Sequence, residues 1–358
     1  MTDSTAHIPR VAIVLLCYNN KDLVQAYLPI IKATIPKHKD YHIVVVNNAG
    51  NDGTDTWVEE NHPEVQLVQI AINKGFTNGY VESLPEVKAK NYVLISADVE
   101  PAENWLLPAL ELLESDDSIA AVQPKVMSWD KKDTFEYAGG AGGYIDYLGY
   151  PFCRGRLVDS LETDQGQFDD VRPIFWASGC CLFIKSEAWE KSGGFDNDFF
   201  AHMEEIDLCW RLRQMGYEIL FEPKSVVYHM GGSVIKYGSP AKTFQNFRNN
   251  GVLLIKNLPL STLLWLIPLR VLLDWAAMLN MFKNGDFKIG WAVIRAQWSL
   301  FSRFGFWWKK RKTVSKLRTR SANDFGVMQK SLVWAFFAKG NRTFSELNWD
   351  PVSKKDAS

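Results

Sequence analysis

The chain has 358 residues, of which 47% are hydrophobic, and its 40 lysines and arginines nearly balance 41 aspartates and glutamates. This apolar content suffices for one large domain or two unequal ones. The five cysteines have no CxxC spacing, which argues against a disulfide framework and against a structural zinc site.

The first residues, "MTDSTAHIPR", lack the apolar stretch of a secretory signal peptide, so we expect a cytosolic protein. Apolar runs that end in polar residues then predict four strands, at 11–20, 41–54, 65–76 and 91–101, with a helix over 21–35. This alternation indicates a doubly wound α/β sheet, whose ligand crevice lies outside the carboxyl ends of the strands. No GxGxxG follows the first strand and no Walker A sequence occurs, so neither phosphate-binding fingerprint is present.

Residues 137–156, "YAGGAGGYIDYLGYPFCRGR", are rich in glycine and tyrosine. They are too aromatic for a flexible linker, and we expect a surface that packs or binds. Residues 175–196 follow as a strand, a short helix and a glycine break.

Residues 251–282 are strongly apolar but are interrupted by Lys256, Arg270 and Asp274. The longest uncharged run, 257–269, contains two prolines and is shorter than the roughly 20 residues that a spanning helix needs. We therefore do not expect a membrane-spanning helix here.

The part of the chain after this segment alternates aromatic and basic side chains. Its aromatic residues are Trp291, Trp298, Phe304, Trp307 and Trp308, and its basic block consists of Arg303, Lys309, Lys310, Arg311, Lys312, Lys316, Arg318 and Arg320. Aromatic rings beside lysine and arginine suit the headgroup level of an anionic bilayer. We expect docking on a membrane surface; a helical pair packed on the rest of the chain, or a homodimer interface, is the alternative.

Two acids, Asp98 and Glu100, follow the fourth predicted strand, and His229 ends a later β-branched run. A hard divalent cation such as Mg²⁺ or Mn²⁺ prefers carboxylate oxygens together with substrate phosphates, and neutral imidazole is a common ligand of transition metals. Surface acids at a strand end and a structural histidine are the alternative readings.

The loops at 47–54 and 73–80 combine asparagine and glycine after predicted strands. Glycines let backbone N–H groups approach a ligand, and asparagine side chains can pair with a base or a sugar. Ordinary turns would show the same residues.

The segment "HMEEIDLCWR" (202–211) crowds three carboxylates into four positions. On a helix Glu204 and Asp207 share a face, while Glu205 lies about 100° away. Arg211 can pair with Asp207, which leaves a glutamate to face a crevice as a general base with a pKa raised by burial. A solvated helix start with acids at its positive end is the alternative.

In this order the motifs resemble the inverting, GT-A-fold glycosyltransferases of family two, especially their rhamnosyltransferase-like bacterial members. The resemblance covers residues from about 10 to 250 and includes "CYNN", "VVNNAGNDGT", "NKGFTNGY", "SADVEP" and the long run from "SGCCLFIK" to "VVYHMGGS". It implies a Rossmann-like, mostly parallel sheet with helices on both faces. The catalytic domain would span 1–250, with a nucleotide-sugar half at 10–105 and an acceptor half at 106–250, before a helical extension at 251–358.

The resemblance also implies roles for particular residues. Asp98, Glu100 and His229 would hold a divalent metal, Mn²⁺ or Mg²⁺, and Glu205 would be the catalytic base, with Glu204 as second choice. Trp176, Asp196, Arg154 and Arg156 would meet the acceptor. The nucleotide-sugar would be bound by Tyr18, Asn19, Asn47, Asn48, Asp52, Asn73, Lys74, Gly75, Phe76, Asn78 and Asp98.

The chain departs from the family pattern at three of these positions. Asn47 replaces the usual aspartate that accepts from uracil, so the choice of base is less defined. The second acid of the metal motif is Glu100, and the base position is Glu205, where the family usually has aspartate. Each change keeps the chemical group that the reaction needs.

The implied reaction moves a sugar from a UDP- or dTDP-type donor to a hydroxyl of a glycan or polyprenyl-linked acceptor, with inversion. It would belong to cell-surface polysaccharide synthesis, at the inner face of the cytoplasmic membrane. One alternative is a nucleotidyltransferase with a similar sheet, although "CYNNKDLVQ" lacks its usual glycine-rich basic loop. Another is a non-catalytic protein that binds a membrane surface or a polyanion through the basic block; we expect no nucleic-acid partner, because such binding would not require the acids.

Overall fold

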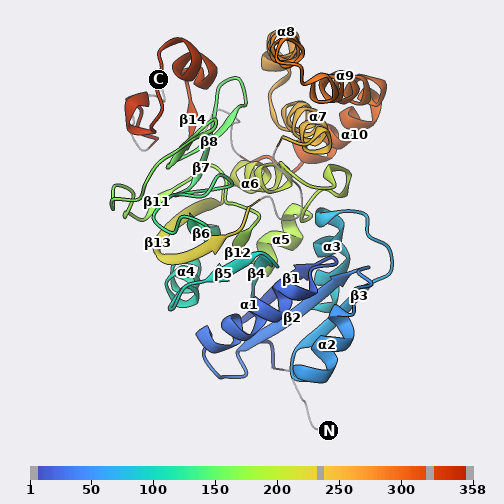
Figure 1. The fold of residues 1–358 in the computed structure, drawn as a ribbon, viewed down its shortest axis with the longest axis vertical. Coiled ribbons are helices and arrows are strands. Elements are labelled where there is room, and N and C mark those ends of the chain that lie inside the picture. The colour runs from blue at the N-terminus through green and yellow to red at the C-terminus, as the bar shows by residue number, and fades with distance from the viewer. Residues whose placement is uncertain (1–6, 232–237, 320–325, 352–358) are drawn as a thin grey trace.

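The computed structural model describes residues 7–231, 238–319 and 326–351. Arg320 of the basic block and Gly232, which follows the His229 motif, lie outside these ranges. Along the long axis of the molecule, the first strands lie at one end and the C-terminal helices at the other (Figure 1).

A nine-stranded sheet forms the core of the N-terminal two thirds of the chain, in the order β11-β13-β6-β12-β4-β1-β2-β3, with β5 paired to β13. Strands β1 to β4 run parallel, and β12 is antiparallel to both β4 and β6. The strands are β1 (Val11–Cys17), β2 (Tyr41–Asn48), β3 (Gln66–Ile70), β4 (Asn91–Ser96), β5 (Val99–Pro101), β6 (Ile119–Ser128), β11 (Arg172–Pro173), β12 (Cys181–Lys185) and β13 (Glu218–His229).

Helices cover both faces of this sheet, because all seven residues of β1 are buried and alternate between two cores. Val11, Ile13 and Leu15 face α1, α2 and α4, while Ala12 and Val14 share the other core with α3, α5 and α6. The helices are α1 (Lys21–Thr34), α2 (Thr54–Asn61), α3 (Phe76–Ser83), α4 (Leu106–Glu114), α5 (Ser186–Ser192) and α6 (Glu204–Gln214). This arrangement puts the polar ends of β1, β2 and β4 at one edge, as the sequence predicted.

The glycine- and tyrosine-rich segment forms part of a second sheet, in the order β10-β9-β8-β7-β14. Gly143 in this sheet packs so closely on Trp176 that a Cβ there would lie 2.1 Å from the indole ring. Tyr144 and Phe152 are fully buried, so the segment packs rather than forming an open surface. The strands are β7 (Gly143–Asp146), β8 (Pro151–Cys153), β9 (Arg156–Leu157), β10 (Ser160–Leu161) and β14 (Val327–Met328).

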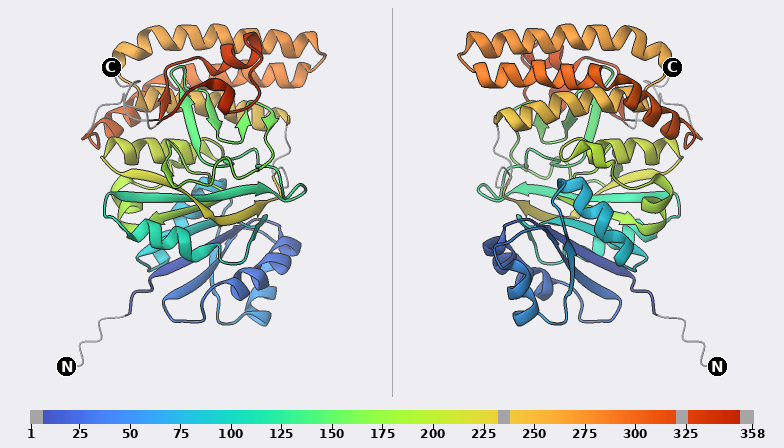
Figure 2. Two further views of the ribbon diagram at one scale, coloured as in Figure 1. Left: turned by 90° about the vertical axis from the view of Figure 1, so that its left-hand side faces the viewer. Right: turned by 90° about the vertical axis from the view of Figure 1, so that its right-hand side faces the viewer.

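Four long helices, α7 (Pro240–Asn257), α8 (Leu260–Lys283), α9 (Phe287–Ser302) and α10 (Phe304–Ser315), form the end of the molecule opposite β1 to β3 (Figure 2). The expected boundary at residue 250 falls inside α7. After α10 the chain returns to the second sheet as β14, which pairs with β7. The C-terminal part is therefore attached to the rest of the protein at both of its ends.

The sequence predicted no helix long enough to span a membrane within residues 251–282. Helix α8 instead continues for 24 residues, with Pro268 inside it. The carbonyl of Leu264 loses its helical partner at this proline, and Leu264 and Pro268 both lie on the exposed side of the helix. Within the described ranges, α8 is the one helix that is long and apolar enough to cross a membrane, by length and composition only. It lies along the outer side of the helical layer instead of projecting from it (Figure 2).

A buried charged cluster joins α6 to the C-terminal helices. The carboxylate of Asp207 is completely buried, and it accepts from Arg211 Nε at 2.9 Å, Lys256 Nζ at 2.7 Å and Asn257 Nδ2 at 2.9 Å. Lys256 also pairs with Asp196 at 2.7 Å. The pairing of Asp207 with Arg211 that the sequence suggested is confirmed. Lys256 and Asn257 of α7 supply the other partners of this carboxylate.

We expect Lys256→Met to lower the free energy of unfolding by about 3 kcal/mol, since it leaves two buried carboxylates short of a cation. Urea unfolding followed by circular dichroism measures this. The exposed Lys309→Met is the matched control and should change stability by less than about 0.5 kcal/mol. Equal effects of the two substitutions would contradict a stabilising role for the cluster.

Candidate active site

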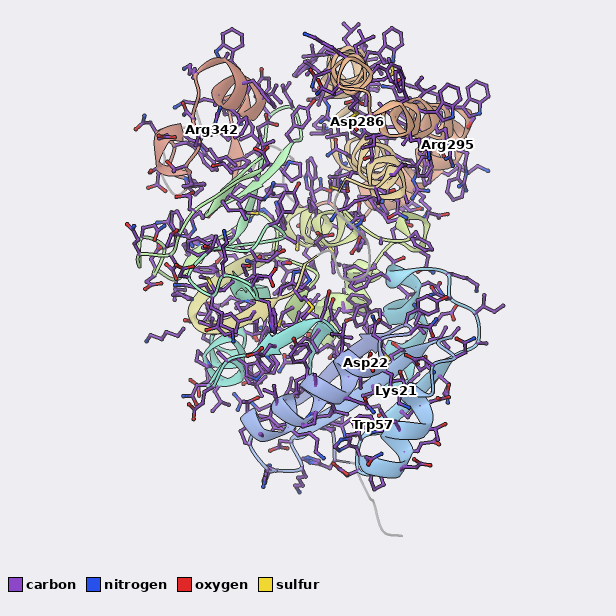
Figure 3. All side chains as sticks on the ribbon, viewed as in Figure 1. Lys21, Asp22, Trp57, Asp286, Arg295 and Arg342 are labelled. Carbon is purple, nitrogen blue, oxygen red and sulfur yellow. The ribbon has the colours of Figure 1, made fainter. Side chains whose placement is uncertain are left out.

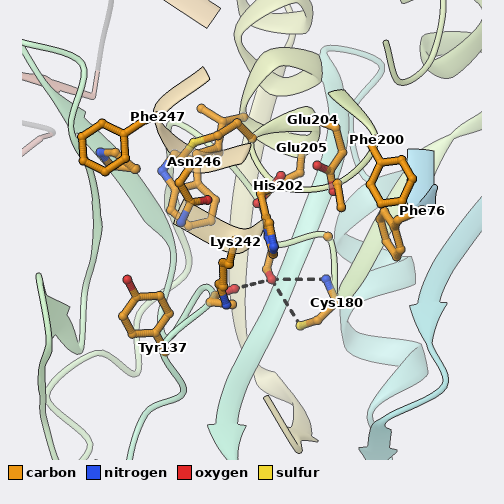
Figure 4. Close-up of a pocket in the computed structure, with 18 of the residues that line it drawn as sticks. Phe76, Tyr137, Cys180, Phe200, His202, Glu204, Glu205, Lys242, Asn246 and Phe247 are labelled. Atoms are coloured by element: carbon orange, nitrogen blue, oxygen red, sulfur yellow. Dashed lines mark hydrogen bonds between the residues drawn. The ribbon is translucent and has the colours of Figure 1, made fainter. Parts of the chain in front are cut away.

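A cavity of about 1150 Å³ begins at the polar strand ends and continues to α8. Phe76 and Phe200 lie beside the two glutamates of α6, and Tyr137 and Phe247 lie on another side of the cavity (Figure 4). Of the predicted nucleotide-sugar residues, those that line it are Tyr18, Asn48, Asn73, Gly75, Phe76 and Asp98.

The remaining predicted nucleotide residues do not line the cavity. Asn47 accepts from the backbone N–H of Gly50 at 2.8 Å, and Asp52 accepts from that of Lys21 at 2.8 Å. These contacts shape the loops. Asn19 accepts from Asn51, Lys74 pairs with Glu82, and Asn78 is buried in α3.

The loop after β3 touches the segment that precedes α6. Gly75 has φ +106°, and a Cβ there would lie 2.6 Å from the carbonyl oxygen of Phe200. The same loop is tied to β2, because Asn48 Nδ2 donates to the carbonyl of Gly75 at 3.2 Å. A glycine is therefore required where three segments of the wall meet.

Asp98 and His229 lie together in the cavity, with Asp98 Oδ1 3.5 Å from His229 Nε2. A second acid, Glu136, lies on the other side of the ring, with Oε2 3.3 Å from Nδ1. Burial opposes a charge on this imidazole, yet Glu136 and Asp98 raise the pKa of His229 well above its usual value. The sequence analysis missed Glu136.

Glu100 does not join Asp98 and His229. Its carboxylate accepts from Trp129 Nε1 at 2.7 Å and from Lys132 Nζ at 2.9 Å, outside the residues that line the cavity. The structure therefore does not bring the three expected metal ligands together, and a metal-binding role of Glu100 stays a prediction. Because β5 pairs with β13, the side chain of Glu100 lies beside Trp129 and Lys132.

The part of the chain that the structure describes contains no group of three or more His, Cys, Asp and Glu side chains placed to hold a metal. Asp98 and His229 nevertheless fit as two ligands of a shared cation once the imidazole, whose pKa is raised, gives up its proton, since a carboxylate oxygen and a neutral imidazole nitrogen suit Mn²⁺. A substrate diphosphate would have to supply further oxygens.

Glu204 and Glu205 begin α6, and both line the cavity. Burial raises the pKa of Glu205 to about 7, and burial together with the charge of Glu205 raises the pKa of Glu204 well above its usual value. Within the described residues, Oε2 of each glutamate is buried and has no hydrogen-bond partner. A carboxylate that ionises near neutral pH is suited to accept a proton from a substrate.

The backbone that leads into these glutamates is held in an unusual conformation. Phe200, His202 and Met203 have φ of 68°, 69° and 71°, in the left-handed region that costs about 1 kcal/mol or more per residue. Asn249 of α7 holds this segment, because its Nδ2 lies 3.0, 2.8 and 2.7 Å from the carbonyls of Phe199, Ala201 and His202. No local signal in the sequence links Asn249 to a segment about 50 residues earlier.

The structure separates the four predicted acceptor residues into two pairs. Trp176 and Arg156 line the cavity. Arg154 does not; its guanidinium is buried, pairs with Asp170 at 2.6 Å and lies over the ring of Phe221.

Asp196 is also away from the cavity, where it pairs with Lys256 and with Lys310 of α10. The sequence pattern showed charge at Arg154 and Asp196, and it could not show that distant partners neutralise both.

Two further cavity residues were missed by the sequence analysis. His202 lies beside the glutamates, and burial together with Lys242 lowers its pKa to about 4, so this imidazole is neutral. Lys242 reaches the cavity from the first turns of α7 (Figure 4). A histidine beside the acidic motif was a usable signal, whereas Lys242 sits in an ordinary polar helix start.

Residues 9–250 match the family described as "Glycosyltransferase like family 2". The chain belongs to this family. It is 24% identical over 212 residues to the N-acetylglucosaminyl-diphospho-decaprenol L-rhamnosyltransferase of Mycobacterium tuberculosis, an alignment that covers 52% of this chain and 66% of that protein. The chain thus spans just under two thirds of that relative's length.

Two solved structures share the fold of this family 2 chain. GalNAc-T7 with UDP, GalNAc and Mn²⁺ is similar with a TM-score of 0.54 and 15% identity, over 70% of this chain and 48% of that one. The mannosyltransferase PcManGT from Pyrobaculum calidifontis, in complex with GDP-Man and Mn²⁺, has a TM-score of 0.50 and 18% identity, over 87% and 86% of the two chains. The GT-A fold and the family expected from the sequence are confirmed.

We expect Glu205→Gln to stabilise the folded protein at pH 8 by about 2 kcal/mol. The folded-state pKa of Glu205, about 7, lies above the usual 4.5, so its contribution to stability is complete below pH 4.5 and is lost as the pH rises through 7. Glutamine cannot ionise and escapes this loss. Urea unfolding at pH 8 and pH 5 measures the difference, which should shrink at pH 5.

The control for this measurement is Glu103→Gln, which changes an exposed glutamate on the same domain. It should leave stability unchanged at both values of pH. A Glu205→Gln variant that is no more stable than the natural protein at pH 8 would show that this carboxylate is not destabilised by burial.

Proposed function

We propose that the protein is a glycosyltransferase that moves a sugar from a nucleoside-diphosphate sugar of UDP or dTDP type to a hydroxyl of a glycan or lipid-linked acceptor. The observation that carries this proposal is that one cavity joins Asp98 and His229, at the strand ends, with the ionisable pair Glu204 and Glu205. A site that only bound a polyanion would not bury two carboxylates beside it.

In the proposed reaction Glu205 accepts the proton of the acceptor hydroxyl as its oxygen attacks the anomeric carbon of the donor sugar. The bond from that carbon to the diphosphate oxygen breaks, and the electron pair leaves with the nucleoside diphosphate. Because attack and departure occur on opposite faces, one displacement inverts the anomeric configuration. Burial and the charge of Glu205 raise the pKa of Glu204 well above its usual value, so a proton kept by Glu204 would limit the charge beside the base.

Mn²⁺ or Mg²⁺ held by Asp98 and His229 would, when bound, offset the negative charge on the donor diphosphate. The chain's own residues place the donor: Asn48 and Asn73 lie at the ends of β2 and β3, and Phe76 packs at the start of α3. Tyr18 is 44% exposed at the mouth of the cavity, where a planar base can stack on it.

We expect Glu205→Gln to reduce turnover at least about 100-fold while nucleotide binding is retained, because it removes the proton acceptor and keeps the shape. A thermal-shift panel of UDP, dTDP and GDP with Mn²⁺ measures binding and identifies the base. Sugar transfer measures turnover. A Glu205→Gln variant with near-normal turnover would contradict the assignment of the base, and no nucleotide stabilisation in the panel would contradict the function itself.

We further propose that the enzyme acts in the cytosol, docked on the inner face of the cytoplasmic membrane. Large apolar side chains of α8 and α9 are exposed, and Asp286 lies at the turn between the two helices (Figure 3). They include Leu264, Trp265, Leu272, Trp275, Leu279, Trp291 and Trp298.

The basic block supports docking only in part. Lys309, Lys312 and Lys316 are exposed, so they can meet anionic headgroups. Lys310 instead pairs with Asp196, and Arg311 donates to the carbonyl of Ile255. Lys310 and Arg311 therefore attach α10 to the protein instead of adding to the cationic surface.

Sedimentation with anionic vesicles tests the membrane proposal. We expect the double substitution Trp291→Ser and Trp298→Ser to lower the partition coefficient about tenfold or more, because both rings are exposed and bury apolar area on docking. Raising the salt concentration should weaken the remaining binding. Equal sedimentation of the natural and substituted proteins would favour a soluble enzyme or a homodimer through this face.

A further inference from the structure

The cavity continues well beyond the two glutamates. Its far part, here called the apolar limb, runs beneath α8 and is bordered by the short helix Trp334–Ala338. The apolar limb is defined by Phe247, Leu273, Ala277, Met281, Val333 and Phe337, and the polar side chains Asp274 and Asn280 of α8 also line this part of the cavity. The nucleotide-sugar of the proposed function would be held by the loops at the other end, so this part of the cavity is left for another ligand.

Two cations, Lys242 and Arg156, also line the cavity, and the charge of Glu136 acts on the pKa of both. Lys242 is the first cavity residue of α7, and Asn246 and Phe247, one turn further along the same helix, already face the apolar limb. Arg156 lies over the ring of Tyr137, with its guanidinium carbon 4.4 Å from the ring centroid, and it also lines the cavity. Arg156 is 5% exposed, and its buried Nε has no hydrogen-bond partner in the described structure.

The outer end of the apolar limb reaches the surface that carries the exposed apolar side chains. Phe337 lines the limb and is 70% exposed, and Trp334 on the same short helix is 64% exposed. Ala277 and Met281 line the limb from α8, whereas Leu272 and Leu279 of the same helix are about 60% exposed. One helix thus separates the cavity from the face that we propose meets the bilayer.

We propose that the apolar limb binds the hydrocarbon chain of a lipid-linked acceptor, and that Lys242 and Arg156 bind the phosphate that joins this chain to the acceptor sugar. The proposal rests on the function proposed above and names the acceptor class for the same site. In this proposal the sugar hydroxyl lies at Glu205, the phosphate at the two cations and the chain beneath α8. A water-soluble glycan would leave the apolar limb without a ligand.

Binding of farnesyl phosphate, inorganic phosphate and farnesol to the full chain tests this proposal. Calorimetry is performed with Mn²⁺ and a saturating nucleoside diphosphate, chosen from the thermal-shift panel, so that the donor's phosphate site is already filled. We expect farnesyl phosphate to bind at least about tenfold more tightly than either of the other two, because it alone meets the cations and buries apolar area. Equal affinities of farnesyl phosphate and inorganic phosphate would overturn the proposal.

Ala277→Trp fills the apolar limb from α8 and should lower the affinity for farnesyl phosphate at least about tenfold. Leu272→Trp changes an exposed residue of the same helix and should leave the affinity for farnesyl phosphate unchanged. Phe337→Ser, at an exposed position, provides a second variant if Ala277→Trp does not fold. Equal effects of Ala277→Trp and Leu272→Trp would overturn the assignment of the limb.

Lys242→Gln should remove most of the preference for farnesyl phosphate over farnesol, while the affinity for the nucleoside diphosphate is unchanged. An unchanged preference would overturn the role of Lys242. These tests could fail while nucleotide binding stays intact and Glu205→Gln is inactive. That outcome would reject the lipid-linked acceptor and retain the proposed glycosyltransferase function.

Discussion

The carboxylate of Asp207 has no exposed surface and is held by Arg211 from its own helix and by Lys256 from α7. A charge that is buried to this degree is stable only with its partners in place, because neither solvent nor rearrangement can replace them. The position of α6 is therefore fixed relative to α7. Since Glu204 and Glu205 form the first turn of α6, the same constraint determines where the candidate base stands in the cavity.

Glu204 and Glu205 need this support, because burial and the closeness of the two carboxyl groups disfavour their ionisation. Two ionisable carboxyl groups sit side by side at low solvent exposure, after a segment with three residues of positive φ. Asn249 holds that segment through the carbonyls of Phe199, Ala201 and His202. The C-terminal helices therefore belong to the catalytic unit as well as to the proposed membrane face, and a division of the chain at residue 250 does not separate the two roles.

The sequence predicted the parts of this protein that depend on local pattern. Buried strands with polar ends, the carboxylate crowding at α6 and the partner of Asp207 all follow from residue type and spacing along short stretches. Asp98 and His229 were also found, because each ends an apolar run that must lie inside the sheet. The fold and family were correct for the same reason.

Contacts between distant segments could not be predicted in this way. Arg154 and Glu100 carry charges that suit a substrate, and only the tertiary structure shows that Asp170 and Lys132 neutralise them. Glu136 reaches His229 from the polar loop after β6, where spacing gives no indication of the contact. The two prolines near α8 suggested a break, whereas the helix begins after the first and tolerates the second at a solvent-exposed turn.

Strand β14 has a consequence for the order in which the protein can fold. It supplies the last partner of β7, yet the ribosome makes it only after α7 to α10 are complete. Until then β7 presents an open edge, a state in which strands associate with the wrong partners. A chain shortened before residue 327 would keep that edge exposed permanently, so loss of this short strand should lead to aggregation even though it lies far from the glutamates in sequence.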